Sequence, residues 1–350
     1  MEERNDILGM LDMITAPGFC VKENQIIKCN PPAAAVFLTE GMEIQSLLGT
    51  GWNAYTQFAG GCLCLNITHM DKTWNATVSR IQDVDVFLLE PDMPSGELQA
   101  LALAARELRS PLNSAMIMAG NFLEQDNPQA QDSVSRLNRA LHQLLRIVGN
   151  MSDAGYACPN PNHSLHEINT VMDEIMGKAE MLCEAAGLHF HYTGLNASVF
   201  SRCDPEILER AIMNILSNSI KFSPKGSAIQ SELTQTGNLL KLSIQDQGCG
   251  ISDAMMRSIF SRYLRQSAIE DSRFGLGLGM VLVRAAALQH GGTVLIDQPA
   301  DRGTRVTLTL EVRQEESRLS DKILRPIAGG YDTGLVELSD VLPASLYLGK

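Results

Sequence analysis

Asn214-Ile-Leu-Ser-Asn218-Ser-Ile-Lys221 is the stretch of this 350-residue chain that decides its fold. Upstream, Asp204-Pro205-Glu206 predicts a helix start, because it supplies an N-cap side chain, a proline in the first turn and an acid that complements the helix dipole. Asn214 and Asn218 are four residues apart and therefore share one helical face. An uncharged amide oxygen suits a Mg²⁺ ion that phosphates have already neutralised, and Lys221 can reach a phosphate as a point charge. An asparagine pair standing alone is more often part of a helix surface or a cap.

A second motif, Asp246-Gln-Gly248-Cys-Gly250, follows the strand predicted over Leu239–Asp246. A buried carboxylate at Asp246 can accept a hydrogen bond from the amino group of adenine. Gly248 and Gly250 let the backbone approach the ring, since a Cβ would intrude. A tight turn after a strand is the alternative interpretation of this motif.

A third motif, Gly275-Leu-Gly277-Leu-Gly279, precedes a helix predicted from about Val281 to His290. Glycines expose backbone N–H groups and the start of a helix favours anions, so this segment can hold a triphosphate. A dinucleotide-binding fingerprint does not fit, because no predicted strand ends immediately before Gly275 and no acidic residue follows at the required distance.

In this order the three motifs resemble the N, G1 and G2 boxes of the Bergerat-type ATP-binding fold, as found in sensor histidine kinases. The resemblance implies that Asn218 contacts Mg²⁺ and that Asn214 supports the phosphates of ATP. Gly303-Thr304, before the last predicted strand, is similar to the family's terminal glycine box. The nucleotide site implied by these motifs comprises Asn214, Asn218, Lys221, Asp246, Gly248, Gly250, Gly275, Gly277, Gly279 and Thr304.

Between the second and third motifs, Ile259-Phe260-Ser-Arg262-Tyr263-Leu-Arg265 is similar to the family's F box. The resemblance implies that residues 266–274 form a lid over ATP and that Phe260 packs at its base. Arg265 and Arg273 are candidate ligands of the γ-phosphate, although exposed arginines are common.

The segment Arg106-Glu107-Leu108-Arg109-Ser110-Pro111-Leu112 resembles the family's H box, whose usual form is His-Glu-Leu-Arg-Thr-Pro-Leu. Imidazole accepts a phosphoryl group because it is largely neutral near pH 7 and keeps a nucleophilic nitrogen, whereas the guanidinium of Arg106 has no free lone pair. We therefore expect no self-phosphorylation at Arg106 by the ordinary mechanism. By resemblance, Glu107 stands where a carboxylate orients the histidine, and Ser110 keeps a hydroxyl that could orient water in a phosphatase reaction.

Residues 94–156 are predicted to form a helical hairpin. In the second helix, apolar residues follow a three–four alternation that marks a packing seam, namely Val134, Leu137, Leu141, Leu144, Val148 and Met151. Asp126-Asn127-Pro128 supplies the turn. Two such helices alone bury little surface, so pairing of two hairpins into a four-helix dimer is expected, with packing against the chain's own domains as the alternative. His142 is the only histidine of the hairpin, but no acid lies beside it.

Residues 1–93 alternate short apolar runs with turns, and their order resembles a PAS-type sensor domain. Helices are expected near residues 6–14 and 32–38, and strands at Gly18–Val21, Gln25–Ile27, Gly61–Ile67, Thr77–Ile81 and Val84–Leu89. Cys62 and Cys64 fall on one face of their strand and are interpreted as small buried apolar residues rather than a metal or redox pair. His69 and Trp74 could line a pocket, although surface or core packing is the commoner role.

The remaining elements form a predicted α/β sandwich over residues 157–313. Tyr156–Ser164 is predicted to be a linker and Leu165–Ala186 a long helix. Further strands are expected at Leu188–Tyr192, Val199–Arg202, Ala228–Gln235, Thr293–Asp297 and Arg305–Val312. Residues 314–350 are predicted to be a tail, whose final stretch, Ser339–Leu348, is apolar enough to dock on a surface that the sequence does not identify.

Bulk composition limits the class of protein. Hydrophobic residues make up 45% and charged residues 19% of the chain, which is typical of a globular protein. Because no run of 18 apolar residues occurs and the first residues lack a secretory pattern, no membrane span and a cytoplasmic location are expected. A net charge of −12 argues against nucleic acid as a partner.

The sequence thus predicts a multidomain fold: an α+β PAS-like domain over 1–93, an all-α hairpin over 94–156, an α/β-sandwich Bergerat ATP-binding domain over 157–313 and a tail over 314–350. Three functional hypotheses remain open. The chain could phosphorylate another protein, or the partner subunit of a heterodimer, in trans. It could be a non-catalytic ATP-binding switch that docks a response regulator or an intact kinase through the hairpin, or a phosphatase for a phosphorylated response-regulator receiver domain.

Overall fold

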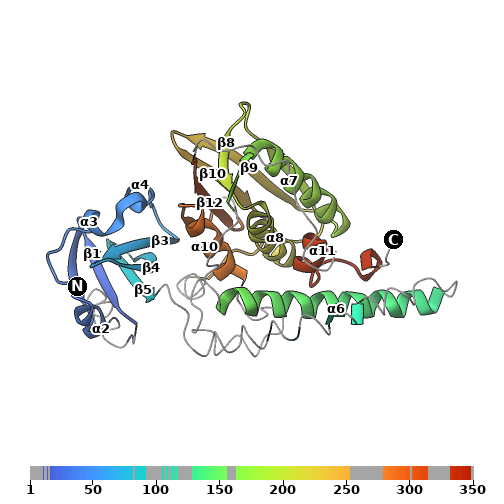
Figure 1. The fold of residues 1–350 in the computed structure, drawn as a ribbon, viewed down its shortest axis with the longest axis horizontal. Coiled ribbons are helices and arrows are strands. Elements are labelled where there is room, and N and C mark those ends of the chain that lie inside the picture. Colours follow the sequence, from blue (N-terminus) through green and yellow to red (C-terminus); the bar gives the residue numbers. More distant parts are fainter. Residues whose placement is uncertain are drawn as a thin grey trace.

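The computed structural model of this protein describes residues 11, 14, 16–81, 83–91, 105, 108, 112–113, 115–116, 128–155, 163–252, 279–299, 302–313 and 332–347. These residues form an N-terminal α/β unit, one long helix, a second and larger α/β unit, and a short C-terminal segment (Figure 1). The C-terminal segment lies between the long helix and the second unit.

The N-terminal unit is an antiparallel sheet in the order β2-β1-β5-β4-β3. Its strands are β1 (Gly18–Lys22), β2 (Gln25–Cys29), β3 (Cys62–His69), β4 (Lys72–Ile81) and β5 (Val84–Pro91). Three short helices pack on this sheet through a shared apolar core: α2 (Pro31–Ala35), α3 (Gln45–Leu48) and α4 (Trp52–Thr56). All five predicted strands are present, and Cys62 and Cys64 are buried as expected.

The long helix α6 (Pro128–Gly155) is the predicted second helix of the hairpin, and it starts at the proline of the predicted turn. Its apolar stripe is divided between two environments. Leu141 and Val148 are buried, whereas Leu137 and Leu144 expose 50% and 46% of their surface. Of the predicted first helix, the structure describes six positions, at 105, 108, 112, 113, 115 and 116, and all six are helical.

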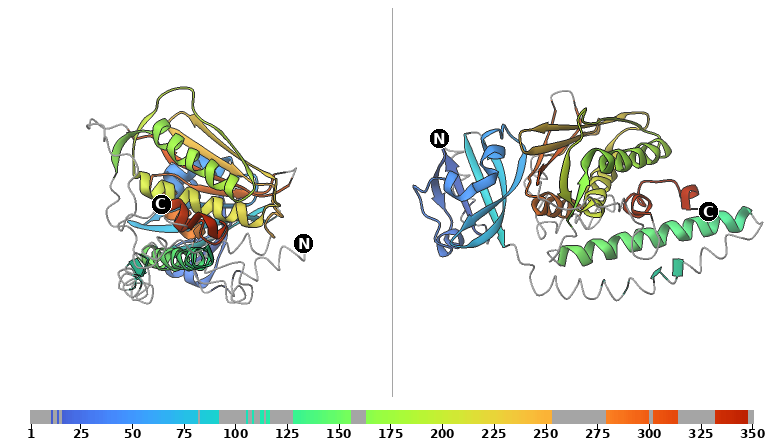
Figure 2. Two further views of the ribbon diagram at one scale, coloured as in Figure 1. Left: turned by 90° about the vertical axis from the view of Figure 1, so that its right-hand side faces the viewer. Right: turned by 45° about the horizontal axis from the view of Figure 1, so that its top comes forward.

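The second unit packs three helices on a mixed sheet: α7 (Ile168–Ala185), α8 (Pro205–Phe222) and α10 (Gly279–Gln289) (Figure 2). Its strands are β7 (His189–Thr193), β9 (Ala228–Thr236), β10 (Leu239–Gln245), β11 (Val294–Asp297) and β12 (Arg305–Glu311). β10 lies antiparallel between β9 and β12, and β7 pairs parallel with β9. Gly237, with φ of 59°, makes the predicted β9–β10 turn.

One predicted boundary in this unit is wrong. The expected helix from Leu165 begins only at Ile168, because Ser164–Glu167 forms strand β6 instead. β6 pairs antiparallel with β8 (Phe200–Cys203), so the pairing of its backbone with a distant segment overrides the local helical pattern. Ser164, expected to end a linker, therefore belongs to a sheet.

The two α/β units share one continuous sheet, a feature that no sequence pattern predicted. β11 pairs antiparallel with β3, which places Val294 opposite Cys64 and Ile296 opposite Cys62. The combined sheet has ten strands in the order β2-β1-β5-β4-β3-β11-β12-β10-β9-β7. This pairing fixes the N-terminal unit against the unit that contains α8, the helix of Asn214 and Asn218.

The C-terminal segment comprises α11 (Thr333–Glu337) and the 3₁₀ helix η4 (Ala344–Tyr347). Both pack on α6, and α11 also packs on α8. The tail thus docks on the protein, and its partners are α6, α8 and, through α11, also α7.

Candidate functional site

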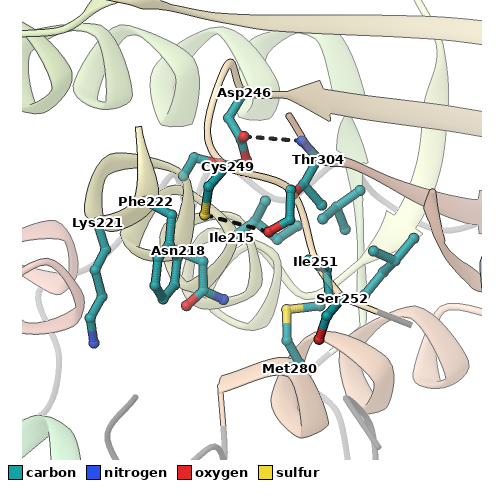
Figure 3. A pocket seen from close by; sticks show the side chains of 14 residues that line it. Ile215, Asn218, Lys221, Phe222, Asp246, Cys249, Ile251, Ser252, Met280 and Thr304 are labelled. Atoms are coloured by element: carbon teal, nitrogen blue, oxygen red, sulfur yellow. Dashed lines mark hydrogen bonds between the residues drawn. The ribbon is translucent and has the colours of Figure 1, made fainter. Parts of the chain in front are cut away.

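Helix α8, the loop after β10 and the start of α10 enclose a pocket (Figure 3). It is lined by Ile215, Asn218, Ser219, Lys221, Phe222, Asp246, Cys249, Gly250, Ile251, Ser252, Met280, Ile296, Thr304 and Val306. Five of the predicted site residues, far apart in the sequence, therefore meet in one cavity: Asn218, Lys221, Asp246, Gly250 and Thr304.

Helix α8 places its share of these residues through a well-defined start. The Asp204 side chain accepts hydrogen bonds from the backbone N–H groups of Glu206 and Ile207, as the predicted N-cap requires. Asn218 and Lys221 then fall near the end of the helix, where both face the pocket.

Asp246 is the buried charge of the pocket. Its Oδ1 accepts hydrogen bonds from the N–H groups of Gly248 (2.8 Å) and Thr304 (3.1 Å), and the Ser219 hydroxyl donates to Oδ2 at 3.3 Å. Burial raises the pKa of this carboxyl above its ordinary value, while the two backbone N–H groups and the Ser219 hydroxyl act in the opposite direction. Two backbone N–H groups thus occupy Oδ1, and Oδ2 has the greater remaining capacity to accept a hydrogen bond from a ligand.

Two glycines allow the chain to come this close to Asp246. Gly303 has φ of 91°, and a Cβ there would lie 2.0 Å from the Asp246 carbonyl oxygen. A Cβ on Gly248 would lie 2.9 Å from both the Phe222 carbonyl oxygen and the Asp246 side chain. Larger residues at either place would push the loop away from α8.

One part of the cavity wall is apolar. Ile215, Met280, Ile296 and Val306 come from four different elements and surround the single buried carboxylate. An apolar slot with one fixed acceptor suits a flat heteroaromatic ring that carries an amino donor. The chemistry of the pocket therefore fits adenine.

Asn214 does not line this pocket. It lies one turn before Asn218, is 1% exposed, and donates both of its amide hydrogens, to the Arg210 carbonyl at 2.9 Å and to Glu337 Oε2 at 3.0 Å. Gly279, the first residue of α10, faces it, since a Cβ on Gly279 would lie 2.7 Å from Asn214 Oδ1. The sequence did not predict a role for Glu337. The only signal that pointed to this region was the apolar character of the tail around it.

The other predicted site residues lie outside the described part of the chain: Arg106, Glu107, Ser110, Phe260, Arg265, Arg273, Gly275 and Gly277. Their roles stay predictions. His142, the single histidine of the hairpin segment 94–156, is buried on α6 with its ring edge-on to Tyr347, at 4.8 Å between centroids. Burial lowers the pKa of His142.

Comparison with known proteins agrees with this geometry. Residues 203–314 match the family of histidine kinase-, DNA gyrase B-, and HSP90-like ATPases. Over 254 residues the chain is 26% identical to the sensor histidine kinase CusS of Escherichia coli K12, covering 70% of this chain and 50% of CusS. Over 260 residues it is 25% identical to the signal transduction histidine-protein kinase/phosphatase MprB of Mycolicibacterium smegmatis, covering 70% of this chain and 51% of MprB.

The chain is thus similar to sensor histidine kinases, and the ATPase family is matched over residues 203–314. The chain spans about half the length of these relatives. Its fold is also similar to full-length ShkA in complex with AMPPNP, with a TM-score of 0.50 at 17% identity over 62% of this chain and 47% of ShkA. The second α/β unit is accordingly an ATPase domain of the histidine kinase type.

Two further observations bear on this histidine kinase homologue. Within the ranges that the structure describes, no helix combines the length and the apolar character needed to cross a membrane. In the same ranges, no three His, Cys, Asp or Glu side chains are grouped as ligands for a metal ion.

Proposed function

We propose that this protein is a two-component signalling protein that binds ATP and Mg²⁺ in the α8–β10 pocket and acts in phosphoryl transfer. The observation that carries the proposal is the meeting of Asp246, Asn218 and Lys221 around one apolar cavity. ATP would supply the phosphoryl group and its electrophilic phosphorus. The chain's own residues recognise, orient and neutralise the nucleotide.

Recognition of the base rests on Asp246. Its Oδ1 is held by two backbone N–H groups, so Oδ2 can accept from the exocyclic amino group of adenine. Ile215 and Met280 would flank the ring and exclude water from this hydrogen bond. The exclusion of water strengthens the hydrogen bond and favours adenine over bases that carry a carbonyl at this position.

Neutralisation of the phosphates rests on the α8 side of the pocket. Asn218 offers an amide oxygen that could hold Mg²⁺, and Lys221 offers a positive charge nearby. The backbone N–H groups at the start of α10 favour anions, and Gly279 keeps that start clear of a side chain. Together these groups provide the positioning and charge stabilisation on which phosphoryl transfer depends.

The phosphoryl group needs an acceptor other than Arg106. Arg106 stands at the acceptor position of the H box and cannot act as a nucleophile at neutral pH. His142 is a poor substitute, since the C-terminal Tyr347 packs against its ring. We therefore favour transfer to a histidine of a partner chain or to a receiver domain, with Glu107 and Ser110 beside the reacting groups.

A dimeric assembly is part of the proposal. Leu137, Leu144 and Ile147 form an exposed apolar face on α6, and Leu108 of the first helix is 52% exposed. Monomeric proteins seldom leave such a row of leucines in water. Two hairpins, within domain bounds of 94–156, would bury these faces in a four-helix bundle, with the PAS-like unit over 1–93 and the ATPase domain over 157–313 attached to it.

Radiolabelled ATP separates the possible activities. Transfer of label from ATP to a partner kinase or to a receiver domain supports the proposed kinase. ATP binding without transfer supports a non-catalytic switch, and faster loss of label from a phosphorylated receiver supports a phosphatase. The variant Arg106→His should gain self-labelling, and its failure to do so despite ATP binding would contradict the role given to position 106.

A further inference from the structure

The C-terminal segment 332–347 is anchored on three helices of the protein (Figure 1). Its side chains Val336, Leu338, Ser339, Leu342 and Tyr347 are buried. Asp332 caps α11 through the N–H of Leu335 and pairs with Lys178 of α7 at 3.0 Å. From α6, Asn138 donates to the Tyr347 carbonyl at 3.1 Å and Arg139 donates to the Ser339 carbonyl at 2.9 Å.

Glu337 is the one carboxylate of this segment that reaches the interior. It is 1% exposed, and Arg210 of α8 donates to its Oε1 at 3.0 Å. Arg146 of α6 lies 3.6 Å from its Oε2, and Asn214 donates to the same oxygen at 3.0 Å. A buried carboxylate is stable only with such partners, so Glu337 ties α6, α8 and the C-terminal segment at one point.

This contact fixes the orientation of the Asn214 amide. Both N–H groups are used, one on the Arg210 carbonyl and one on Glu337. A flipped amide would set its oxygen against these two acceptors, so the oxygen must face the other way. There it lies beside Gly279, at the start of α10.

The Asn214 oxygen has no hydrogen-bond partner among the residues that the structure describes, although it is fully buried. A buried acceptor in this state normally finds a donor or a ligand. An oxygen acceptor repels phosphate oxygens but suits a cation or a water molecule bound to one. Its location, one helical turn from Asn218 and beside Gly279, the last of the predicted phosphate-binding glycines, indicates the Mg²⁺ end of the nucleotide site.

We propose that Glu337 is a positioning residue of the nucleotide site: it holds the Asn214 amide so that the amide oxygen faces the Mg²⁺ and its waters. The inference rests on the proposed binding of ATP and Mg²⁺. If Glu337 has this role, docking of the C-terminal segment on α6 and binding of Mg²⁺·ATP stabilise each other. The C-terminal segment then contributes to nucleotide binding. Thermodynamic linkage requires this coupling to be equal in both directions.

The first test measures ATP affinity by calorimetry, with Mg²⁺ and with EDTA. The factor by which Mg²⁺ raises ATP affinity should be about tenfold smaller in Glu337→Ala than in the unmodified protein, which is the scale of one hydrogen bond to a charged group. The ATP affinity measured in EDTA should change little. Asp340→Ala is the matched control. Asp340 lies in the same C-terminal segment, is 40% exposed and pairs with Arg146 of α6 at 2.5 Å. In an Asn214→Ala background, Glu337→Ala should have no further effect on the Mg²⁺-dependent affinity, whereas a general structural role would lower it in both backgrounds.

Hydrogen exchange on the unmodified protein provides a second test that needs no variant to fold. The amides of Val336 and Leu338, which donate within α11, should exchange more slowly with Mg²⁺·ATP than with ATP in EDTA. Equal exchange in the two conditions, or an unchanged Mg²⁺ dependence in Glu337→Ala, would overturn the inference and leave ATP binding intact. If the unmodified protein binds no ATP, both the inference and the proposed function fail.

Discussion

Arg284 of the ATPase domain donates a hydrogen bond to Glu90 of the N-terminal unit across 2.8 Å, although 194 residues separate them in the chain. Arg284 is 2% exposed and lies on α10, whose first turn borders the nucleotide pocket. The pair stands beside the β3–β11 junction, where Cys64 faces the same guanidinium. The N-terminal unit thus has a direct physical connection to α10, the helix whose first turn borders the pocket.

Loss of Glu90 should destabilise the protein by about 2 kcal/mol, because Glu90→Ala leaves a buried guanidinium without its carboxylate. The control is Asp297→Ala, which removes the more exposed pair with Arg305 and should cost about 1 kcal/mol or less. Urea unfolding at pH 7 measures both changes. Equal costs for the two variants would show that the junction pair adds nothing specific.

His290 should make stability fall in mild acid. Its Nδ1 donates to the Ala286 carbonyl at 2.7 Å and its Nε2 accepts from the Asp204 N–H at 3.0 Å, so the ring is held neutral. Burial is the main cause that lowers the pKa of His290 to about 4, and the groups facing it are His163, Asp204 and Arg313. Since an unfolded histidine titrates near ~6.5, the unfolded state binds the extra proton below that pH.

The stability contributed by His290 is therefore complete above pH ~6.5 and is lost as the pH falls toward about 4, by up to roughly 3 kcal/mol. The measurement is the difference in unfolding free energy between the protein and His290→Gln, at intervals from pH 7.5 to 4.5. This difference should shrink in acid. A constant difference over that range would rule out a neutral, buried His290.

Gly303 should tolerate no side chain. Gly303→Ala places a Cβ 2.0 Å from a backbone oxygen in a left-handed conformation, so a loss of about 3 kcal/mol and weaker ATP binding are expected. Gly226→Ala is the matched control, with a similar φ of 78° but nothing within 4 Å of the added carbon. It should cost about 1 kcal/mol and leave ATP affinity unchanged. Thermal unfolding and calorimetry compare the two, and an ATP affinity preserved in Gly303→Ala would argue against the loop geometry.

The exposed face of α6 should hold two copies together. Leu137→Asp with Leu144→Asp places two charges in the proposed four-helix bundle and should shift the protein from dimer to monomer in sedimentation velocity. Met181, 72% exposed on α7, lies outside that face, and Met181→Asp should leave the dimer intact. A dimer that survives both leucine substitutions would assign this face to another partner.

Local chemistry explains what the sequence could predict. The Asp204 cap, the Gly237 turn and the strand positions depend on neighbours within a few residues, and each is present. The proximity of Asn218, Asp246 and Thr304 could be predicted because their motifs resemble those of a known family. The three residues do line one pocket.

Contacts between distant segments explain what the sequence could not predict. Ser164–Glu167 forms a strand because β8 is available to pair with it, which a helical pattern cannot reveal. The β3–β11 pairing and the Glu337–Asn214 hydrogen bond join residues with no shared periodicity or motif. Sequence patterns report on neighbours along the chain, and these features arise only when the domains have packed.

The central claim, that Asp246 reads the amino group of adenine, is tested most directly by the ratio of affinities for ATP and for inosine triphosphate, which carries a carbonyl in place of that amino group. The unmodified protein should prefer ATP by about tenfold or more, as one matched hydrogen bond predicts. Asp246→Asn keeps the oxygen that accepts from Gly248 and Thr304 but replaces Oδ2 by a donor, so the preference should vanish or reverse. A protein that binds both nucleotides equally, or a ratio unchanged by Asp246→Asn, would contradict the assignment of this pocket.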